Sequence, residues 1–481
     1  MESQQPDQAV LDFVHQAFNN EYLEGLKEFV RIPSLAPLFD PEWQTNGHLY
    51  RQCDHLVNFA KSQDLKGVNI TALKDEGKSP FLIVNVEPTD PTSESCVLLY
   101  GHMDKQPFGE GWKTEPTDPV IQPDEKGVLK LYGRGSSDDG YAFFSALLAI
   151  KACQANGRAH PRCIITIEGS EEGEIDDLLY YIQNYKHLMG KPQLVICLDS
   201  EANMRDRLSI TTTLRGYLDF TLSVRVADNN IHSGVGSGIV PNPFQIMITL
   251  LQRLEDFKTQ RMIDELQVKV PEHRIDELQK TSELMPPLDE DLPKLGCVHN
   301  LAHKFGDKEK YQLFINNFWS PSLSVIGFEG LPTIEKAGNV LYQELRCKVS
   351  LRLPPTLSGE EAAKVVSAKI LEERPETFGA KIDFQITSTG NGLDAPKLPD
   401  DIHKKFLEAH TVVFGGNEPI SVGCGGSIPF MEIFSSNFPG TNFLLTGVGF
   451  ADANAHAANE NLDLEFCERL VQVIALTLTR L

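Results

Sequence analysis

The chain has 481 residues, 41% hydrophobic and 23% charged, which is typical of a globular protein and long enough for at least two domains. Acidic residues number 67 against 44 basic ones, and a net charge of −23 argues against nucleic acid or an anionic membrane as the main partner. No apolar run approaches the roughly 18 residues that a membrane-spanning helix requires.

The first residues and the cysteines predict a cytoplasmic location. The segment MESQQPDQAVLDF has neither the basic nor the apolar region of a secretory signal. The nine cysteines are scattered, several of them inside apolar strand-like runs, and no CxxC pair occurs. An odd number of cysteines without an export signal is typical of a reducing compartment.

The first 200 residues alternate helices with apolar strands. Periodic apolar positions predict helices over 8–31 and about 47–63. The strands FLIVNV and CVLLYG follow, and then a helix over about 141–155, the strand RCIITIEG, a helix over about 175–188 and the strand QLVICLD. Buried strands separated by amphipathic helices indicate an α/β layered sheet.

The pattern changes after the tripeptide LRG that ends at Gly216. We expect the strand YLDFTLSVRV, a helix over 243–257, the strands SLSVIGFEG and VLYQELRCKVSLRL, a helix over 358–373 and the strand AKIDFQITST. This β-α-β-β-α-β order predicts a ferredoxin-like unit. A charged, proline-containing stretch at about 258–320 interrupts it and is expected to be a partly helical insertion.

From about Gly390 the α/β pattern returns, with a helix over 400–413, the strand NFLLTGV and a closing helix over 462–481. The predicted fold class is therefore α/β, with a larger mixed-sheet α/β/α domain and an inserted ferredoxin-like α+β domain. The predicted domains are 1–214 and 390–481 for the two parts of the larger domain, and 215–389 for the inserted one; the resemblance described below makes the larger one the catalytic domain and the inserted one a lid or dimerisation domain.

A histidine and a carboxylate follow the strand CVLLYG. Because alternate side chains of an extended chain point to the same side, His102 and Asp104 can converge just past the C-terminal end of this strand. Ligands bind at that edge of open α/β sheets. By itself the short pattern His-x-Asp is common and is explained equally well by a surface loop.

Four further groups of polar residues stand at or just past strand ends or before a helix. They are Asp138 with Asp139, Glu171 with Glu172, Asp199, and His456. Singly, each has a plain structural explanation, such as a helix cap for the aspartates or a solvated acidic turn for the glutamates. A carboxylate that closes an apolar strand, as Asp199 does, needs a partner or a metal.

Together these residues provide two imidazoles and several carboxylates at one predicted rim of the sheet. Nitrogen and oxygen ligands without thiolate suit Zn²⁺, Mn²⁺ or Co²⁺. Carboxylates outnumber histidines and one of them can bridge, so two metal ions are expected. Paired metals polarise a carbonyl group and activate a water, which indicates metal-assisted hydrolysis.

The motifs GHMDKQP, LYGRGSSDDG, EGSEEGE, LDSE and AHAANE, in this order and spacing, resemble the M20 family of metallopeptidases. The resemblance covers nearly the whole chain and is strongest to the branch that holds carnosinase and cytosolic nonspecific dipeptidase. It implies two zinc or manganese ions that share a bridging carboxylate and a water. It assigns one ion to His102 and Asp199, the other to His456 and Glu172, and the bridging role to Asp138.

The same resemblance makes Glu171 the general base, which takes a proton from the water and passes it to the leaving amine. Asp104 would orient the imidazole of His102. Zn²⁺ is the ion expected first, with Mn²⁺ and Co²⁺ as alternatives.

Three further motifs resemble the family's substrate-handling residues. In NNIHSG, His232 matches a histidine that stabilises the oxyanion in the neighbouring subunit's site, which implies a homodimer completed in trans. In SLRLPP, Arg352 matches the residue that holds the substrate's free carboxylate. In CGGSIP, Gly426 and Ser427 match a second contact for that group, while Cys424 is expected to be structural. Singly, these residues are as well explained by surface loops and turns.

Two positions depart from the family pattern. The branch usually has Lys-Gly after the paired aspartates, whereas Gly140 and Tyr141 stand here. Asn339 stands where related dipeptidases often carry a threonine near the substrate. Both departures bear on the substrate preference more than on the chemistry.

The predicted function is hydrolysis of dipeptides or short peptides that have a free C-terminal carboxylate. The main alternative is removal of an acyl group from an N-acyl amino acid, since the same metals, base and carboxylate contact would serve it. A non-catalytic binding protein is a more remote alternative, because such relatives lose ligands or the base and this chain retains them.

Overall fold

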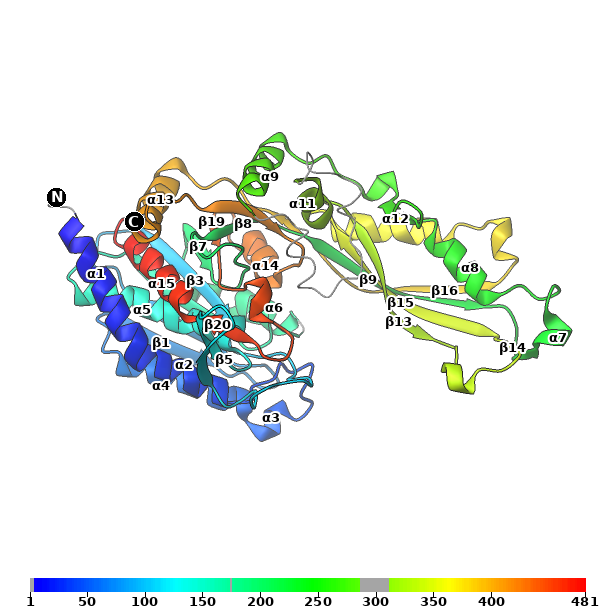
Figure 1. Ribbon diagram of the computed structural model, residues 1–481, viewed down its shortest axis with the longest axis horizontal. Helices are drawn as coiled ribbons and strands as arrows, with labels where there is room; N and C mark the ends of the chain where they lie inside the picture. Colours follow the sequence, from blue (N-terminus) through cyan, green and yellow to red (C-terminus); the bar gives the residue numbers. More distant parts are fainter. Residues whose placement is uncertain (1–3, 174, 286–310) are drawn as a thin grey trace.

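The computed structural model describes residues 4–173, 175–285 and 311–481. Within these ranges the chain forms a larger lobe, which contains the first and last described residues, and a smaller elongated lobe built from the middle of the chain (Figure 1). The predicted α/β fold class is confirmed. No helix in the described part of the chain is long and apolar enough to span a bilayer.

The larger lobe is built on a mixed sheet with the strand order β1-β2-β6-β3-β7-β19-β8-β17, and β18 pairs beside β8. These strands are β1 (Val68–Leu73), β2 (Phe81–Val86), β3 (Cys96–His102), β6 (Arg162–Glu168), β7 (Leu194–Cys197), β8 (Ser209–Leu214), β17 (Leu393–Asp394), β18 (Ile420–Cys424) and β19 (Asn442–Leu445). Strands β6, β3, β7 and β19 run parallel, so their carboxyl ends meet at one edge of the sheet.

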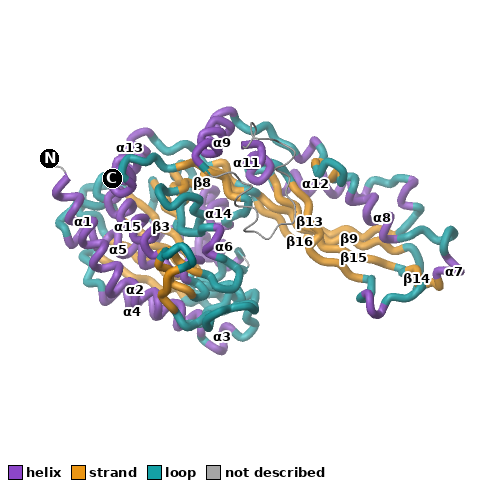
Figure 2. Tube along the Cα trace, in the orientation of Figure 1, coloured by secondary structure: helices purple, strands orange, loops and turns teal. Residues whose placement is uncertain are grey.

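Helices cover both faces of this sheet (Figure 2). They are α1 (Gln4–Ala17), α2 (Leu23–Arg31), α3 (Trp43–Asn46), α4 (His48–Ser62), α5 (Tyr141–Ala155), α6 (Asp176–Tyr185), α13 (Asp400–Phe414), α14 (Pro429–Asn437) and α15 (Leu464–Leu478). Strand β3 shows why three layers form: Val97 and Leu99 pack in one buried cluster with α1, α5 and α15, whereas Leu98 and Tyr100 pack in another with α6 and α14.

The helix predicted over 8–31 is interrupted by a π-helical turn at Phe18–Tyr22, which separates α1 from α2. Three short strands that sequence analysis did not predict form a second sheet in this lobe, in the order β20-β5-β4. They are β4 (Val120–Pro123), β5 (Leu129–Tyr132) and β20 (Asn461–Asp463). Because β20 pairs with β5, the turn after residue 132 lies beside the loop before residue 461.

The smaller lobe contains a four-stranded antiparallel sheet with the order β13-β15-β9-β16. In chain order its elements are β9 (Gly216–Arg225), α8 (Pro243–Leu251), β13 (Ser322–Glu329), β15 (Glu344–Leu353), α12 (Gly359–Leu371) and β16 (Lys381–Gly390). The apolar side chains of β9 and β15 alternate with polar ones and pack against α8 and α12. The element order is therefore that of a split β-α-β unit.

Two features of this lobe differ from or extend the sequence prediction. The helix expected over 243–257 ends at Leu251, and the carboxylate of Asp256 accepts the backbone N–H of Lys258 in a turn between β11 (Glu255–Asp256) and β12 (Arg261–Met262). The insertion at 258–320 contains α9 (Glu272–Leu284) and α11 (Tyr311–Phe318), and the rest of that prediction, at 286–310, lies outside the described residues. A two-stranded antiparallel sheet of β10 (Ile231–His232) and β14 (Val340–Leu341), with the short helix α7 (Ser233–Gly236), lies at the far tip.

Candidate metal centre

His102 is the last residue of β3, at the edge where the parallel strands end. Its side chain is buried, and its Nδ1 lies 3.1 Å from the backbone oxygen of Asp104 and 3.5 Å from that residue's carboxylate. The opposite nitrogen, Nε2, lies 3.1 Å from Oδ1 of Asp138. The ring is therefore held from one side and directs its other nitrogen toward the centre of the site, as a metal ligand requires.

Asp138 lies between the two histidines that sequence analysis selected. It comes from the turn between β5 and α5, and its Oδ2 lies 3.0 Å from Nε2 of His456. Burial of the Asp138 carboxyl opposes its ionisation, but the contacts with His102 and His456 outweigh burial and lower its pKa. One charged carboxylate thus faces an imidazole with each of its oxygens.

Glu172 completes this group. Its Oε2 lies 3.3 Å from Nε2 of His456 and accepts a hydrogen bond of 2.7 Å from the side-chain amide of Gln106. Burial and the charge of Asp138 raise the pKa of Glu172 to about 7. Contacts with Asp138 and Glu172 raise the pKa of His456 to about 10. Protonation of Glu172 and of His456 is therefore favoured by their surroundings.

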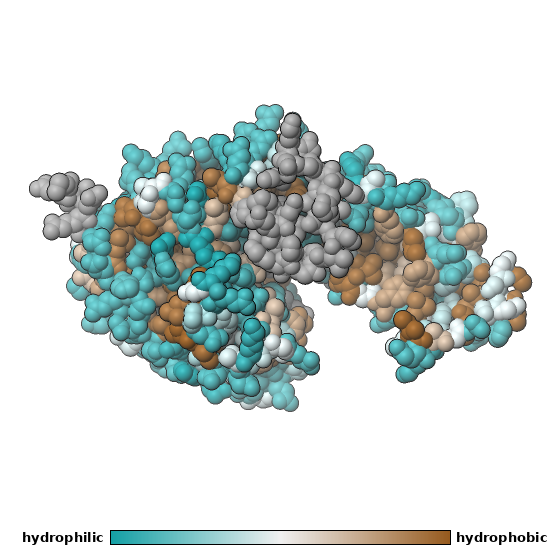
Figure 3. Space-filling model, viewed as in Figure 1, coloured by the Kyte–Doolittle hydropathy of each residue, from teal (hydrophilic) through white to brown (hydrophobic). Residues whose placement is uncertain are grey.

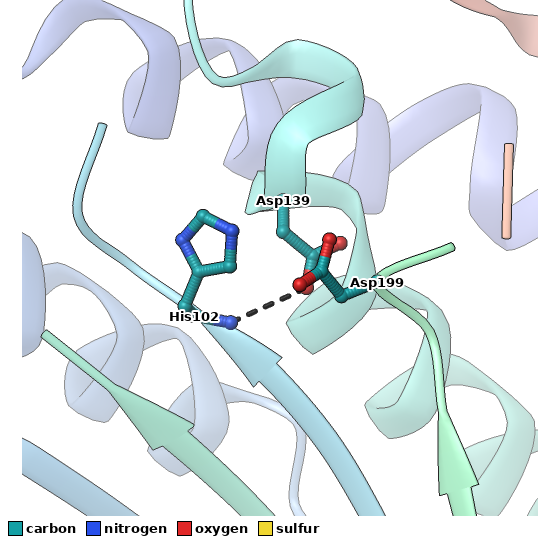
Figure 4. Close-up of side chains that lie close together, drawn as sticks. All are labelled: His102, Asp139 and Asp199. Atoms are coloured by element: carbon teal, nitrogen blue, oxygen red, sulfur yellow. Dashed lines mark hydrogen bonds between the residues drawn. The ribbon is translucent and has the colours of Figure 1, made fainter. Parts of the chain in front are cut away.

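A second group shares His102 and contains Asp139 and Asp199 (Figure 4). Asp139 follows Asp138 directly, and its Oδ2 accepts the backbone N–H of His102 at 3.2 Å. Asp199 follows β7, and burial raises its pKa to about 6. The candidate ligand atoms of His102, Asp139 and Asp199 lie within 4.8 Å of one another, and so do those of His102, Asp138 and Glu172. The sequence alone assigns no role to Asp139, because adjacent side chains cannot be assigned to one centre or another before the turn that carries them is known.

These residues fit divalent cations. Oδ1 of Asp139 and Oε1 of Glu172 are buried and have no hydrogen-bond partner among the described residues. Several carboxylates share the space with only two imidazoles, and burying so much unpaired negative charge is unfavourable unless cations compensate it. The donor set is nitrogen and oxygen only, which suits Zn²⁺, Mn²⁺ or Co²⁺.

Glu171 lies next to Glu172 but belongs to neither ligand group. Both oxygens of Asp104 accept backbone N–H groups here, from Glu171 at 3.2 Å and from Glu172 at 3.0 Å. Asp104 therefore holds the turn that carries both glutamates, in addition to its contact with His102. Burial and then the charge of Asp199 raise the pKa of Glu171 well above its usual range.

The ligand groups open into a cleft of about 1880 Å³ between the two lobes (Figure 3). The predicted site residues among those that line it are Asp138, Glu171, Glu172, Asp199, His456, Arg352 and Ser427. Arg352 comes from β15 of the smaller lobe and Ser427 from the loop after β18 of the larger one. One cleft thus contains the carboxylates together with a guanidinium from the smaller lobe and a hydroxyl from the larger lobe.

Arg215 is a second guanidinium in this cleft, and sequence analysis used it only as a domain boundary. It donates from Nε to the oxygen of Gly425 at 2.9 Å and from Nη1 to the oxygen of Ser320 at 3.1 Å. Burial and then the nearby Arg352 lower the pKa of Arg215 to about 10. Cys424 also lines the cleft, and its sulfur accepts the backbone N–H of Gly426 at 3.3 Å, which agrees with a structural role for that thiol.

His232 and Asn339 lie elsewhere. They belong to the two-stranded sheet of β10 and β14 and its flanking residues at the far tip of the smaller lobe, where the backbone N–H of Ser233 donates to the oxygen of Asn339 at 3.0 Å. Neither residue is among the described residues that line the cleft. Within one chain, the structure therefore does not bring them to the ligand groups.

The position after the paired aspartates has no room for a side chain. A Cβ atom on Gly140 would stand 2.5 Å from the ring of Phe29, so the lysine that is usual in this branch would not fit here without a shift of that ring. The buried Lys105 packs on the same ring, with its Nζ 4.6 Å from the ring centre. It donates to the backbone oxygens of Phe29 at 2.8 Å and Ile32 at 2.7 Å, at the end of α2.

Known proteins resemble this chain in sequence and in fold. The yeast (Saccharomyces cerevisiae) Cys-Gly metallodipeptidase DUG1 is 27% identical over 391 residues, which cover 80% of this chain and 79% of that protein. The mouse (Mus musculus) Beta-Ala-His dipeptidase is 26% identical over 464 residues, covering 92% and 89% of the two chains. The structure of human carnosine dipeptidase 1 superposes with a TM-score of 0.77 at 22% identity, covering 98% of both chains.

The family model described as peptidase family M20/M25/M40 matches residues 98–480, which is most of the chain and contains both ligand groups. That span begins inside β3, just before His102, and ends beyond His456. With these matches and the groups that the buried His102 forms with neighbouring carboxylates, the chain belongs to peptidase family M20/M25/M40 and is a metallopeptidase.

Proposed function

We propose that this metallopeptidase hydrolyses dipeptides or short peptides that have a free C-terminal carboxylate. The observation that carries the proposal is the composition of the cleft, in which Arg352 and Ser427 share one cavity with Glu171 and the ligand groups. A guanidinium binds a carboxylate through paired, charge-assisted hydrogen bonds. The names of the yeast and mouse relatives, both dipeptidases, support the same substrate class.

Two divalent ions are proposed for the site, with Zn²⁺ expected first. His102 and Asp199 would hold one ion, and His456 and Glu172 the other. Asp138 would be shared, since its two oxygens already face the two imidazoles at 3.1 and 3.0 Å. When bound, such ions polarise the peptide carbonyl and lower the pKa of a water at neutral pH.

The proton transfers are proposed for Glu171. This carboxylate lines the cleft beside the ligand groups, and it is left free when Glu172 acts as a ligand. It would take a proton from the attacking water and pass it to the amine that leaves. Asp104 would keep Glu171 in place by accepting its backbone N–H, and would orient His102 at the same time.

Arg352, Gly426 and Ser427 are proposed to bind the C-terminal carboxylate of the substrate. Arg215 holds the loop that carries the last two, through the oxygen of Gly425 and through its own backbone N–H to the oxygen of Gly426 at 2.9 Å. A substrate held at this end would place its peptide bond toward Glu171 on the opposite side of the cleft.

A homodimer is proposed to complete the site. His232, and Asn339 next to it, would reach the cleft of the partner subunit, where the imidazole donates a hydrogen bond to the carbonyl oxygen that gains negative charge. Two observations support this. The tip that carries His232 on β10 is not part of the described lining of the cleft of its own chain, and the edge strand β13 exposes Ile326 and Phe328, with 54% and 42% of their surfaces accessible.

The cytoplasm remains the proposed location. The eight cysteines in the described part of the chain are all free thiols, and most are buried. Such thiols are typical of proteins kept in a reducing compartment.

The experiment that tests the function compares free dipeptides with the same dipeptides acetylated at the amine, using protein reconstituted with Zn²⁺ and then with Mn²⁺. We expect cleavage of the free dipeptides only. Cleavage of the acetylated set alone would show an N-acyl amino acid deacylase, and no cleavage by metal-loaded protein would favour a binding protein.

A further inference from the structure

Glu460 and Arg134 form a buried ion pair that has no role in the chemistry proposed above. Their side chains are 0% and 1% exposed, and Nη1 of Arg134 donates to Oε2 of Glu460 at 2.7 Å. A buried ion pair is often no more stabilising than well-packed apolar side chains of similar volume, because both charges lose their hydration. A contribution to stability alone therefore does not explain this ion pair, whereas its position among the loops of the site does.

The carboxylate of Glu460 accepts hydrogen bonds from several backbone N–H groups of the turn that carries Asp138. Its Oε1 accepts from the backbone nitrogens of Ser137 at 3.0 Å and Asp138 at 3.1 Å, and from the hydroxyl of Ser137 at 3.2 Å. Both of its oxygens lie 3.1 Å from the nitrogen of Gly135. Converging backbone N–H groups form an anion site, and here the chain fills that site with its own carboxylate. The residue that faces both histidines is thus anchored through its backbone.

Arg134 connects this turn with the two loops that carry His102 and His456. Its Nη2 donates to the oxygen of Pro107 at 2.9 Å and to the oxygen of Ala457 at 3.2 Å. Pro107 lies in the loop that follows His102 and Asp104, and Ala457 is the neighbour of His456. One ion pair therefore contacts all three loops that carry the ligands of the group around Asp138 and the two histidines.

We propose that Glu460 and Arg134 are positioning residues that hold the loops of His102, Asp138 and His456 at metal-binding distance from one another. This inference rests on the metal site proposed above. The loops are far apart in the chain and share no secondary structure with one another beyond the pairing of β5 with β20, so a common anchor limits their independent motion. Groups that orient metal ligands typically change metal affinity by about 10–100-fold when they are replaced.

Glu460→Gln is the informative substitution. The amide has the size of the carboxylate but only one acceptor oxygen, so it can accept from Arg134 or from the turn at 135–138, and not from both. Asp394→Asn is the matched control, because Asp394 accepts from the buried Arg274 at 2.8 Å and that pair lies outside the three loops. Both changes remove one charge from a buried arginine pair.

The measurement is Zn²⁺ binding by calorimetry to the full-length protein after removal of metal by a chelator, together with the melting temperature of the metal-free form. We expect the Zn²⁺ affinity of Glu460→Gln to fall about 10–100-fold and that of Asp394→Asn to stay at the wild-type value. Glu460→Asp, which keeps the charge, should recover part of the affinity. With Zn²⁺ in excess, kcat of Glu460→Gln should fall more than KM rises, because the substrate contacts are untouched.

Wild-type Zn²⁺ affinity in Glu460→Gln would overturn the inference while leaving the proposed function intact. A wild-type protein that binds neither Zn²⁺ nor Mn²⁺ would instead overturn the metal site itself. If Glu460→Gln does not fold, Arg134→Lys takes its place, because a lysine keeps the charge but cannot donate to Glu460, Pro107 and Ala457 together. Unchanged Zn²⁺ affinity in that variant would likewise overturn the inference.

Discussion

Glu171 and Glu172 are adjacent in the chain, yet their side chains make different contacts, which supports a different proposed role for each. Glu172 contacts His456 and Gln106, whereas Glu171 belongs to neither ligand group and lines the cleft. The backbone of both is held by the two oxygens of Asp104, so the turn offers one carboxylate to each task. Glu172 can thus serve as the proposed ligand while Glu171, beside it, serves as the proposed proton carrier.

Glu171→Ala is expected to keep the metal content of the wild type and to lower kcat by about 10²–10⁴-fold or more, because only the proton carrier is removed. Metal content is measured by atomic emission after dialysis, and turnover by release of free amino acid. Glu172→Ala is the contrasting variant and should lose metal as well as turnover. Substantial turnover in Glu171→Ala would show that another group moves the proton.

Arg352→Met is expected to lower kcat/KM for a free dipeptide by about 10–100-fold, since a charge-assisted contact with the substrate carboxylate is lost. The same dipeptide with an amidated C-terminus should be a poor substrate of the wild type and should be little affected by the change. Arg346→Met provides the control, because Arg346 is exposed on the same strand, β15. Equal losses with the free and the amidated substrate would exclude a contact with the carboxylate.

The parallel strands and the helices that cover them bring the ligands to one edge of the sheet. Strands β3 and β7 end side by side, and His102 and Asp199 follow from these two ends. Helix α13 supports the sheet at β8, where the buried His410 accepts the backbone N–H of Leu208 through Nε2 at 3.0 Å. This contact requires the neutral imidazole.

His410 is expected to make the protein less stable in acid. Burial lowers its pKa from 6.5 to about 4, so between these values the unfolded chain binds a proton that the folded chain does not. Stability therefore falls as the pH decreases from about 6.5 to 4, by about 3 kcal/mol from this residue. Urea unfolding at pH 7 and pH 4.5 should show a smaller pH dependence for His410→Gln than for the wild type. His403→Gln, an exposed position on α13, should keep the wild-type dependence.

The two ends of the smaller lobe carry different candidate site residues. Its base contributes Arg352 to the cleft, and its tip carries His232 on β10, which pairs with β14. Exposed apolar side chains lie between them on β13 and α8, where the rings of Phe244 and Phe328 are 6.0 Å apart. This surface is suited to a contact with a second copy of the chain.

His232→Ala is expected to lower kcat by about 10²–10³-fold without changing metal content, since one hydrogen bond to the developing oxyanion is lost. Mixing His232→Ala with Glu171→Ala, after unfolding and refolding them together, tests the trans arrangement. In a mixed dimer, the subunit that retains Glu171 receives His232 from its partner, so about a quarter of wild-type activity should return for random pairing. No recovery in dimers shown to be mixed would place His232 outside the partner's site.

The sequence predicts the α/β class, most of the longer strands and helices, and the candidate residues at strand ends. These predictions are possible because burial imposes periods of two and 3.6 residues on the chain, and because parallel strands place their carboxyl ends at one edge. The short strands β4, β5 and β20 were not predicted. His102, Glu172 and Asp199 are candidates at strand ends and His456 in the loop before the last helix, and the resemblance to the M20 family suggests their roles.

Contacts between segments that are distant in sequence are known only from the folded structure. Glu460 meets Arg134 across 326 positions, and Lys105 donates to the backbone oxygens of Phe29 and Ile32 at the end of α2. The separate surroundings of Asp138 and Asp139 likewise depend on one turn. Such contacts follow from how packed elements meet, and no local periodicity records them. The sequence therefore shows that Glu460 and Arg134 are present, but not that they contact each other.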